Sequence, residues 1–516
     1  MPPLIKTSDK TEEMRSQMRV KAMSDPFYLA TEILGYTDSY EPLHRPMAEW
    51  FADWPKGKRN RLTLIPRGHF KTTYGTIVDS IYQWMYDPML AVLNGHAELK
   101  QTLKNCEELK NHFEVNDKFR FIAPDLCYEN PRKESPNWKV DQFTIKRPRY
   151  WRVPSFVATS TGASVVGLHF DIYKLDDLVD SKNSLTEEQC EKVIEWFKNL
   201  RYTVHDPATV RWDVIGTRWS LNDLYAWLMQ PGRDERQAKK IMSIFTDDSE
   251  SETIFPTRFP ITEVEHMRVD TGSWQFSCQY MNKPVPADSK MFKEQDIVFF
   301  DLRAWEELYE QDPHHWNIFT AVDPNRGQDP RRHDPGCVLT VAVDSMGNHY
   351  VIDVDYRCFG VDEIIAVMRQ HVDRWNPQFV CLETTAGQNY LMEWALKEQL
   401  QNARPYTIRE MKRGGNAHKS LRILRCQPMI ERRRLHLPGD PGEDHPLYKE
   451  VKDYPHGKND HALDALADIV QAGYEPATFS LPKAPSGTYT LEKLTQRIAD
   501  RKPKMPGILN VAGKNW

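Results

Sequence analysis

Short apolar runs that end in polar residues recur along the chain and predict strands alternating with helices. In the first half, the runs expected to form strands are residues 61–65, 91–96, 169–177 and 211–219, and residues 72–86 predict a helix. Another helix is expected over 25–36, with Asp25 as its N-cap and Pro26 at its first position. This alternation favours an open, mostly parallel α/β sheet with its site along the carboxyl edge.

The pattern changes near residues 284–300, where proline and polar residues indicate a linker. Beyond it, three consecutive strands are expected over 318–324, 337–344 and 349–356, then a helix over 360–375 and a strand over 378–384. Three strands, a helix and a further strand predict a second α/β domain with a mixed sheet. We therefore expect an N-terminal domain, a linker, a second domain and a flexible tail over residues 1–285, 286–300, 301–475 and 476–516.

Composition narrows the classes of protein to consider. The chain has 516 residues, long enough for two or three domains, and no run of ~18 apolar residues, so no membrane span is expected. Its eight cysteines are scattered singly, which argues against structural zinc or a disulfide framework and favours a reducing cytoplasm. The net charge of −5 predicts no general affinity for nucleic acid, so such a function would need local basic patches.

The stretch LIPRGHFKTTYG at residues 64–75 holds a lysine followed by two threonines, as a phosphate-binding loop does. Such a loop is normally G-x-x-x-x-G-K-[ST], and here Ile65 and Phe70 stand at the two glycine positions. The stretch still has a strand before it, Gly68 for a sharp turn and a helix after it, which is the order needed to hold an anion. The alternative is a basic surface turn.

Two other strand ends extend this hypothesis. Asp176 and Asp177 end the run DIYKLDD, where a P-loop ATPase has one acid for Mg²⁺ and one that orients the attacking water. A simple turn is the alternative, and Lys174 is an unexpected residue for a buried strand. Thr217 and Arg218 end a further run and could sense the γ-phosphate or couple hydrolysis to movement.

In this order, PRGHFKTT, GLHFDIYKLDD and GTRWSLNDL resemble the ATPase half of the large terminase subunit of tailed bacteriophages. Residues 255–286 resemble the segment that closes that domain and leads to a nuclease. Loops of the form PRGHxKT, without the glycine before the lysine, are familiar in this family. The resemblance therefore implies that the missing glycine is tolerated.

The resemblance also implies a role for each loop residue. Arg67 would help to sense or stabilise the γ-phosphate, Lys71 would bind phosphate, and Thr72 would bind Mg²⁺. Asp177 stands where many relatives have a catalytic glutamate, so its shorter side chain must lie closer to the water or act through a second one. His44 lies where relatives often place a glutamine that contacts adenine. The ATP-binding residues would be Arg67, Gly68, His69, Phe70, Lys71, Thr72 and Thr73.

Four acids in the second half have the spacing of a metal site. Asp323 and Glu383 end predicted strands, and Asp460 and Asp464 lie four residues apart on one face of a predicted helix. Acids from two strands and a helix can converge on two divalent ions ~4 Å apart, which activate water for phosphodiester cleavage. Oxygen ligands suit Mg²⁺ or Mn²⁺. The alternatives are turn-forming aspartates and, for Asp460, a helix cap.

The order of these acids after the strand–strand–strand–helix–strand pattern resembles an RNase H-like nuclease, the second half of the large terminase subunit. The sequence leaves open which of Asp460, His461 and Asp464 binds metal. Residues 404–434 hold ten Lys and Arg against two Glu, which suits salt-sensitive binding of any DNA sequence. The alternative is a solvated basic face; our candidate DNA-binding residues are Lys412, Arg413, Lys419 and Arg422.

The resemblance implies a viral DNA-packaging motor that moves double-stranded DNA into procapsids with ATP and Mg²⁺, and cuts it with a Mg²⁺- or Mn²⁺-dependent nuclease. It implies as partners the small terminase subunit and the portal protein, with a homo-oligomeric ring during packaging; a monomer is the alternative state of the free chain. The expected location is the bacterial host cytoplasm, transiently at the procapsid portal. The alternative is an ATP-dependent helicase or remodeller whose second domain binds DNA without cutting it.

Overall fold

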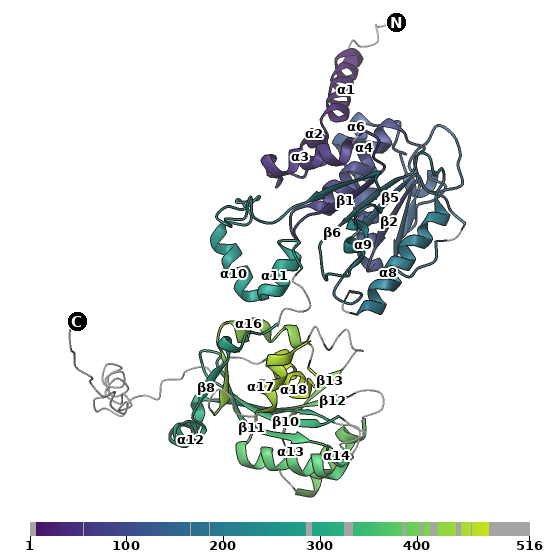
Figure 1. Ribbon diagram of the computed structural model, residues 1–516. Helices are drawn as coiled ribbons and strands as arrows, with labels where there is room; N and C mark the ends of the chain where they lie inside the picture. The colour runs from purple at the N-terminus through teal and green to yellow at the C-terminus, as the bar shows by residue number, and fades with distance from the viewer. Residues whose placement is uncertain are drawn as a thin grey trace, which may run out of the picture.

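Figure 1 shows two α/β domains, one above the other, in the computed structural model. The structure describes residues 7–473 except 55, 166, 185, 285–290, 325–333, 385–388, 403–405, 413–418, 420–421, 440–444 and 456. Each domain has its own sheet and its own buried apolar clusters. The predicted tail, residues 476–516, and residues 286–290 of the predicted linker lie outside the described residues.

The first sheet has seven strands, in the spatial order β3 (Gln142–Phe143), β4 (Phe156–Ser160), β2 (Val92–His96), β5 (Ile172–Asp176), β6 (Arg211–Gly216), β1 (Asn60–Leu64) and β7 (Gln237–Ile241). Every pair of neighbours is parallel except β3 and β4. The carboxyl ends of β1, β2, β5 and β6 therefore meet at one edge. The mostly parallel sheet predicted for this half is confirmed.

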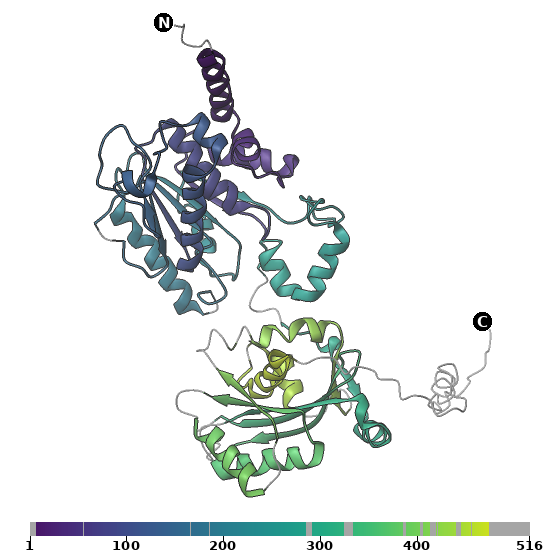
Figure 2. The ribbon, with the colours of Figure 1, turned by 180° about the vertical axis from the view of Figure 1, so that it is seen from behind.

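Helices cover both faces of this sheet (Figures 1 and 2). One apolar cluster joins the sheet to α3, η2, α4 and α5, and the other joins it to α8 and α9. Burial on both faces explains why the strands are continuous apolar runs. The helical segments before α10 are α1 (Thr7–Ser24), α2 (Pro26–Tyr28), η1 (Leu29–Ile33), α3 (Glu41–Ala52), η2 (Thr73–Val78), α4 (Asp79–Tyr86), α5 (Leu99–Glu114), α6 (Asp117–Ile122), α7 (Pro131–Glu134), α8 (Glu187–Asn199), η3 (Leu200–Thr203) and α9 (Leu224–Met229).

Two helices complete the first domain: α10 (Ile261–Thr271) and α11 (Ser273–Gln279). In Figure 1 they lie on the side of the first domain that approaches the second. The predicted cap is also confirmed, because the Asp25 side chain accepts a hydrogen bond from the Tyr28 N–H and Pro26 begins α2.

Lys174, unexpected in a buried strand, belongs to an ion cluster within the first domain. Its Nζ contacts carboxylate oxygens of Asp79 on α4 and Asp213 on β6, and the Arg61 guanidinium on β1 also binds Asp213. All four side chains are at most 1 % exposed. Two cations and two anions neutralise one another there, which is the condition for burying charge at all.

The second sheet is mixed, as predicted. Its order is β13 (Ile408–Lys412), β12 (Phe379–Thr384), β9 (Asn317–Asp323), β10 (Gly336–Val343), β11 (His349–Arg357), β14 (Leu435–Pro438) and β8 (Val298–Phe300). The central strands β9, β10 and β11 pair antiparallel, and the outer pairs are parallel. The four strands expected from the sequence are all present, with ends shifted by a single residue at most.

Helices also cover both faces of the second sheet. The helical segments of this domain are η4 (Glu294–Asp296), α12 (Leu302–Gln311), η5 (Pro313–His315), α13 (Val361–Trp375), α14 (Asn389–Asn402), α16 (Gln427–Glu431), α17 (Pro446–Asp453) and α18 (His461–Ala472). Side chains of α17 and α18 join one apolar cluster with the sheet, and those of α13 and α14 join another on the opposite face. In the described part of the chain, no helix is both long and apolar enough to cross a membrane.

Candidate active sites

The first candidate site is the loop between β1 and the helix that continues through η2 and α4. The loop turns through two residues with left-handed backbone, Gly68 at φ +80° and Phe70 at φ +56°. A Cβ added to Gly68 would lie 2.8 Å from Cζ of Phe259, so this glycine is needed for space as well as for conformation. Phe70 occupies the position before the lysine, where the usual pattern has glycine.

Phe70 adopts the glycine-like conformation because its ring is held on several sides. It stacks on His44 with centroids 5.1 Å apart, and the Arg258 guanidinium lies 5.0 Å from its centroid. Phe255 packs edge-on at 6.0 Å. A left-handed backbone conformation raises the free energy of the folded state by about 1–3 kcal/mol at a non-glycine residue, so it persists only where surrounding packing compensates. The loop thus has the backbone course that glycine normally permits, with an aromatic side chain.

The predicted loop lysine and strand-end acids come together at the carboxyl edge of the first sheet. Lys71 Nζ lies 3.0 Å from Asp177 Oδ2. Asp176 is 1 % exposed, and its Oδ2 accepts a hydrogen bond of 3.4 Å from Thr76 Oγ1. Burial and the neighbouring Asp177 raise the pKa of Asp176 to about 7, against the lowering effects of Lys71, Thr72 and Thr76.

The donor set suits a magnesium ion with a nucleotide. One carboxylate oxygen of each acid, Oδ1 of Asp176 and Oδ1 of Asp177, is buried without a hydrogen-bond partner among the described residues. The Thr72 hydroxyl is close enough to affect the pKa of Asp176, so the three side chains share one small region. Oxygen ligands of this kind, next to a lysine, fit Mg²⁺ and phosphate.

Sequence reasoning missed His96, which ends β2 beside Asp177. The backbone N–H of Ala97 donates to the Asp177 carbonyl at 3.1 Å, and His96 Nδ1 accepts from the Glu98 N–H at 2.9 Å. Burial lowers the pKa of His96, while the charges of Asp177 and Asp180 oppose that effect. Its place at the end of a parallel strand was the available signal, because such ends line the same edge.

The other predicted residues of this site differ in where they point. The Arg67 side chain is exposed, and its guanidinium lies 5.9 Å from the Trp219 ring centroid. Thr217 and Arg218 are buried, and Arg218 Nε donates to Asp223 Oδ2 at 3.0 Å. The Arg218 guanidinium is thus held by an acid of its own domain. The coupling role of Thr217 and Arg218 stays a prediction.

His44, on α3, and His69, in the loop, are both neutral core residues. Neither His44 nor His69 is exposed, and burial lowers the pKa of each to about 4. His44 Nδ1 accepts from the Tyr40 N–H at 2.7 Å, and His69 stacks on Phe259 with centroids 4.6 Å apart. They therefore support the loop's shape, while contact of His44 with adenine stays a prediction.

The second candidate site lies where β9 ends beside the start of α18. Asp323, the last residue of β9, is 3 % exposed, and its Oδ2 lies 2.8 Å from His461 Nδ1. Burial alone would lower the pKa of His461, but the hydrogen bond and the charge of Asp323 raise it overall. The pair therefore favours the protonated, cationic histidine.

Asp460 and Asp464 are each paired with a basic residue from the predicted DNA-binding stretch. Lys419 Nζ lies 2.6 Å from Asp460 Oδ1 and 3.6 Å from Asp464 Oδ2, and Arg422 Nη2 lies 2.6 Å from Asp464 Oδ1. Burial opposes the charge on Lys419, but Asp464, Asp460 and Asp323 raise its pKa overall. Lys419 thus contacts two of the predicted acids, and the charge of Asp323 acts on it as well.

Glu450 on α17 was not predicted, and it explains how α18 begins. Its Oε1 accepts from the His461 N–H at 3.1 Å and its Oε2 from the Leu463 N–H at 2.8 Å. Asp460 precedes the helix but makes no side-chain cap bond. The alternative reading of Asp460 as a cap is therefore wrong, because a carboxylate from another helix satisfies those N–H groups.

For some predicted residues of this site the structure describes only the backbone, and for one of them it describes nothing. Glu383 lies on β12, paired in register with Met411 of β13. Lys412 is the last residue of β13. The side chains of these two residues, and all of Arg413, lie outside the described residues. Their roles in metal and DNA binding stay predictions.

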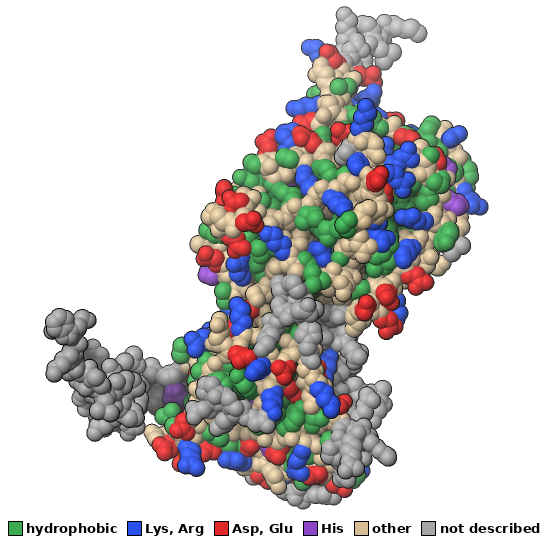
Figure 3. All heavy atoms as spheres, in the orientation of Figure 1, with side chains coloured by type: hydrophobic (Ala, Val, Ile, Leu, Met, Phe, Trp, Pro, Cys, Tyr) green, Lys and Arg blue, Asp and Glu red, His purple; other side chains and the backbone are tan. Residues whose placement is uncertain are grey.

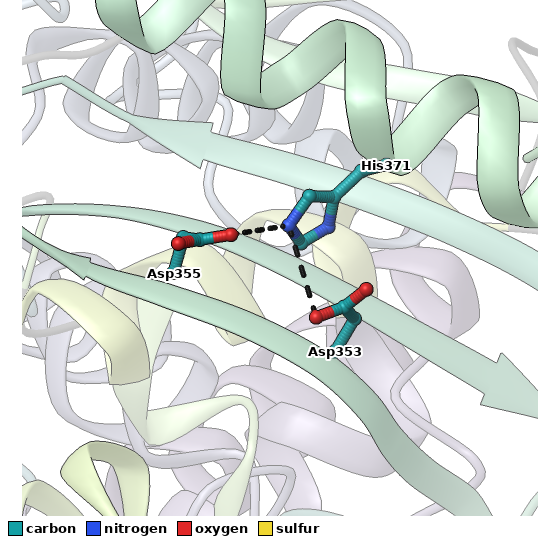
Figure 4. A group of neighbouring side chains, drawn as sticks. All are labelled: Asp353, Asp355 and His371. Carbon is teal, nitrogen blue, oxygen red and sulfur yellow. Dashed lines mark hydrogen bonds and ion pairs between the residues drawn. The ribbon is translucent and has the colours of Figure 1, made fainter.

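A third cluster, not singled out from the sequence, lies on the opposite face of the second sheet. Asp353 and Asp355 on β11 face His371 on α13, whose Nε2 is 3.0 Å from Asp355 Oδ2 and 3.9 Å from Asp353 Oδ1 (Figure 4). The other ring nitrogen of His371 bonds Thr340 Oγ1 at 2.8 Å, and Asp353 accepts from Trp375 Nε1 at 2.7 Å. These groups already satisfy one another, so the cluster fastens α13 to the sheet.

On the face of the molecule seen in Figure 3, Lys and Arg side chains are interspersed with acidic and apolar ones. Among the side chains that the structure describes, no continuous basic stripe crosses that view. Of the four predicted DNA-binding residues, the two with described side chains, Lys419 and Arg422, contact acids of the second site.

Comparison with known proteins bears on the second domain. Residues 320–472 match the family model described as "Terminase RNaseH-like domain". The second domain is a terminase RNase H-like domain. The match begins within β9, at Thr320, and ends at Ala472, the last residue of α18, so Asp323 and Asp464 both lie inside it. It confirms the resemblance to large terminases that the motifs of this half indicate.

Solved terminase structures resemble the chain at low sequence identity. The HK97 bacteriophage large terminase is 12 % identical, with a TM-score of 0.36 over 84 % of this chain and 95 % of that one. The large terminase nuclease of thermophilic phage G20c with bound magnesium is 12 % identical, with a TM-score of 0.26 over 36 % of this chain and 98 % of that one. A mutant ATPase domain of the Thermus phage P74-26 large terminase is 14 % identical, with a TM-score of 0.32 over 49 % of this chain and 97 % of that one. No curated protein matches the chain.

Proposed function

We propose that this chain is the motor of viral genome packaging, an ATPase that moves double-stranded DNA into a procapsid and a nuclease that cuts it. The observation that carries the proposal is the arrangement of acids where β9 ends beside α18 in a terminase RNase H-like domain: Asp323 contacts His461, and Lys419 contacts both Asp460 and Asp464. The same chain also has a phosphate-loop site with Lys71, Asp176 and Asp177. Two such sites on one polypeptide suit coupled movement and cutting.

In the first site, the loop N–H groups and Lys71 would hold the phosphates of ATP, and Arg67 would stabilise the γ-phosphate. Thr72 and Asp176 would hold Mg²⁺, which supplies neutralisation of the phosphate charge. Asp177 would orient the attacking water; its carboxylate contacts Lys71 in the structure at 3.0 Å. That contact must lengthen when Lys71 turns to phosphate, which releases Asp177 for the water.

In the second site, Asp323, Glu383, Asp460 and Asp464 would hold one or two Mg²⁺ or Mn²⁺ ions, which activate water and stabilise the leaving oxygen. His461 would hold Asp323 in place through its 2.8 Å contact. Glu450 would fix the start of α18 and so the position of the acids beside it. The basic stretch that includes Lys412, Arg413, Lys419 and Arg422 would bind the DNA backbone.

For partners, we propose the small terminase subunit and the portal protein, with a ring of this chain around DNA during packaging. This part of the proposal follows from the terminase assignment of the second domain. The expected place of action is the cytoplasm of a bacterial host.

One observation favours a second candidate, an ATP-dependent helicase or remodeller whose second domain binds DNA without cutting it. Each of the three acids with described side chains is already paired with a basic group of the same chain, namely His461, Lys419 or Arg422. A domain of that kind could present acids that never bind metal.

The two candidates are separated by two single variants. With Mn²⁺ and supercoiled plasmid, the purified wild-type protein should nick or linearise the DNA. Asp323→Ala should abolish cleavage and keep ATP hydrolysis, whereas Lys71→Ala should abolish hydrolysis and keep basal cleavage. Plasmid cleavage that survives Asp323→Ala would refute the nuclease assignment. Absence of cleavage by the wild type both without and with ATP, while hydrolysis is intact, would favour the helicase.

A further inference from the structure

Lys419 occupies carboxylate oxygens that a divalent ion at this site would need. Its ammonium lies 2.6 Å from Asp460 Oδ1 and 3.6 Å from Asp464 Oδ2. Arg422 adds a second cation, 2.6 Å from Asp464 Oδ1 and 3.6 Å from Asp468 Oδ1. An ion shared by Asp460 and Asp464 would repel both groups at close range, so binding it requires at least Lys419 to withdraw.

The segment that carries Arg422 continues into α16, and α16 is fastened to the first domain. The Ser273 N–H at the start of α11 donates to Glu431 Oε2 at 3.0 Å, and Gln427 Nε2 donates to Ser273 Oγ at 3.3 Å. Next to them, Arg432 pairs with Asp270 of α10. The fit is close, because a Cβ on Gly272 would lie 2.9 Å from Gln427 Oε1.

The other end of α11 is bonded to the phosphate loop. Gln279, its last residue, accepts at its carbonyl from the Arg67 N–H at 3.2 Å. Its side-chain Nε2 also donates to the Arg218 carbonyl at 3.0 Å. One short helix therefore touches the nucleotide loop at its carboxyl end and the nuclease domain at its amino end (Figure 1).

We propose that α11 and α16 link the two sites, so that nucleotide binding draws Lys419 and Arg422 away from the acids and opens the nuclease centre to metal. The proposal rests on the proposed function for the identity of the two sites. A bound phosphate recruits the N–H groups of its loop, and it therefore competes with Gln279 for the Arg67 N–H. Losing that bond frees α11, and with it the Glu431 contact that holds α16.

The first test measures metal binding without any cleavage. In Mn²⁺ titrations of the full chain followed by calorimetry, with no nucleotide present, Lys419→Ala should bind Mn²⁺ about tenfold more tightly than the wild type. Lys397→Ala is the control, since Lys397 is an exposed lysine on α14. Lys419→Met keeps the side-chain stem and gives the same comparison should the alanine variant unfold.

The outcomes of this titration separate the two proposals. Equal or weaker Mn²⁺ binding by the Lys419 variants overturns the competition between Lys419 and metal. Asp323→Ala should weaken Mn²⁺ binding; if it does not, the assignment of the metal site itself fails, whatever Lys419 does.

The second test follows Lys419 directly through its reaction with an acetylating reagent, quantified by mass spectrometry. At fixed Mg²⁺, adding a non-hydrolysable ATP analogue should raise acetylation of Lys419 severalfold and leave that of Lys397 unchanged. The rise should vanish in Lys71→Ala, and also in Ser273→Ala/Glu431→Ala, which leaves the Ser273 N–H without its acceptor on α16 and removes the hydroxyl contact as well. Unchanged or reduced acetylation of Lys419 in the wild type, or a rise that persists in the double variant, overturns the link.

Discussion

At the scale of single residues, Phe70 shows how a phosphate loop can do without its usual glycine. A left-handed backbone at φ +56° is held by an aromatic ring packed between His44 and Arg258. The sequence alone could not reveal this, because Phe255 and Arg258, which hold the ring, lie far along the chain. The consequence is an unusual ranking of substitutions at this position.

We expect Phe70→Gly to be less destabilising than Phe70→Ala, by about 1 kcal/mol, although glycine normally costs more than alanine. Both variants lose the ring contacts, but only glycine adopts φ +56° without strain. Denaturant unfolding, monitored by the fluorescence of tryptophans in the first domain, measures the difference. An alanine variant as stable as the glycine variant would show that the loop relaxes to another conformation.

His44 should make stability depend on pH. Burial lowers its pKa from 6.5 to about 4, so between these values the folded protein binds fewer protons than the unfolded chain. Stability should therefore fall as pH drops through that window, by about 1.4 kcal/mol per pH unit for one such histidine. His44→Phe keeps the stacked ring and should remove this part of the slope. A slope equal to that of the wild type, measured by urea unfolding at pH 4.5 to 6.5, would contradict it.

At the scale of elements, the sequence predicted where strands lie better than what holds them together. Apolar runs located β1, β2, β5 and β6 because strands buried on both faces are continuous in hydrophobicity. The partly exposed edge strand β7, Gln237–Ile241, has no such run and was not predicted. Lys174 was unexpected for another reason. The acids that neutralise it lie on α4 and β6, and an ion pair between separate elements leaves no pattern in the local sequence.

Lys174→Met should destabilise the first domain by about 3–5 kcal/mol, because it leaves two buried acids with a single arginine among the described residues. Lys192→Met is the matched control, since Lys192 lies on the surface of α8 in an exposed pair with Glu188 and should change stability by less than about 0.5 kcal/mol. Thermal unfolding of both variants makes the comparison. Similar melting temperatures would mean that the buried acids take up protons instead.

For the candidate sites too, residues at the ends of elements could be predicted, whereas contacts between elements could not. Lys71 with Asp176 and Asp177, and Asp323 with the start of α18, could be found because they end strands or begin helices. The pairing of Lys419 and Arg422 with the acids could not, since a basic stretch in a sequence looks alike whether it meets DNA or a carboxylate of its own chain. Glu450 was missed because a cap supplied by another helix has no sequence spacing.

At the scale of the whole molecule, the two domains meet through small, specific contacts of α10 and α11 with α16. Gly272 lies at the centre of this junction with φ +81° and no room for a side chain. Its substitution therefore tests the junction itself.

Gly272→Ala should loosen the two domains and speed proteolysis of the segment between them severalfold. Gly35→Ala is the control: Gly35 has a similar φ of +89° but open space around it, so it has the backbone strain without the clash. Limited trypsin digestion followed by mass spectrometry compares the rates. Equal rates for both variants would mean that backbone strain alone, and not the contact with Gln427, governs the junction.

Removing divalent metal should leave the fold of the second domain nearly unchanged, because His461, Lys419 and Arg422 balance the acids. Excess EDTA should therefore lower the melting temperature of the wild type by no more than a few degrees. Lys419→Ala, whose acids lack one partner, should be stabilised more by Mn²⁺ than the wild type. A collapse of the wild-type fold in EDTA would show that metal is structural.

The internal counter-ions have a meaning for the cell that makes this protein. A nuclease whose acids attract metal as soon as the chain folds would threaten every DNA molecule around it, including the genome it serves. In the folded chain, Asp460 and Asp464 are instead neutralised by Lys419 and Arg422 of the same chain. With the function proposed above, the enzyme would accumulate in a latent form, and its cutting centre would have to be unlocked for each use.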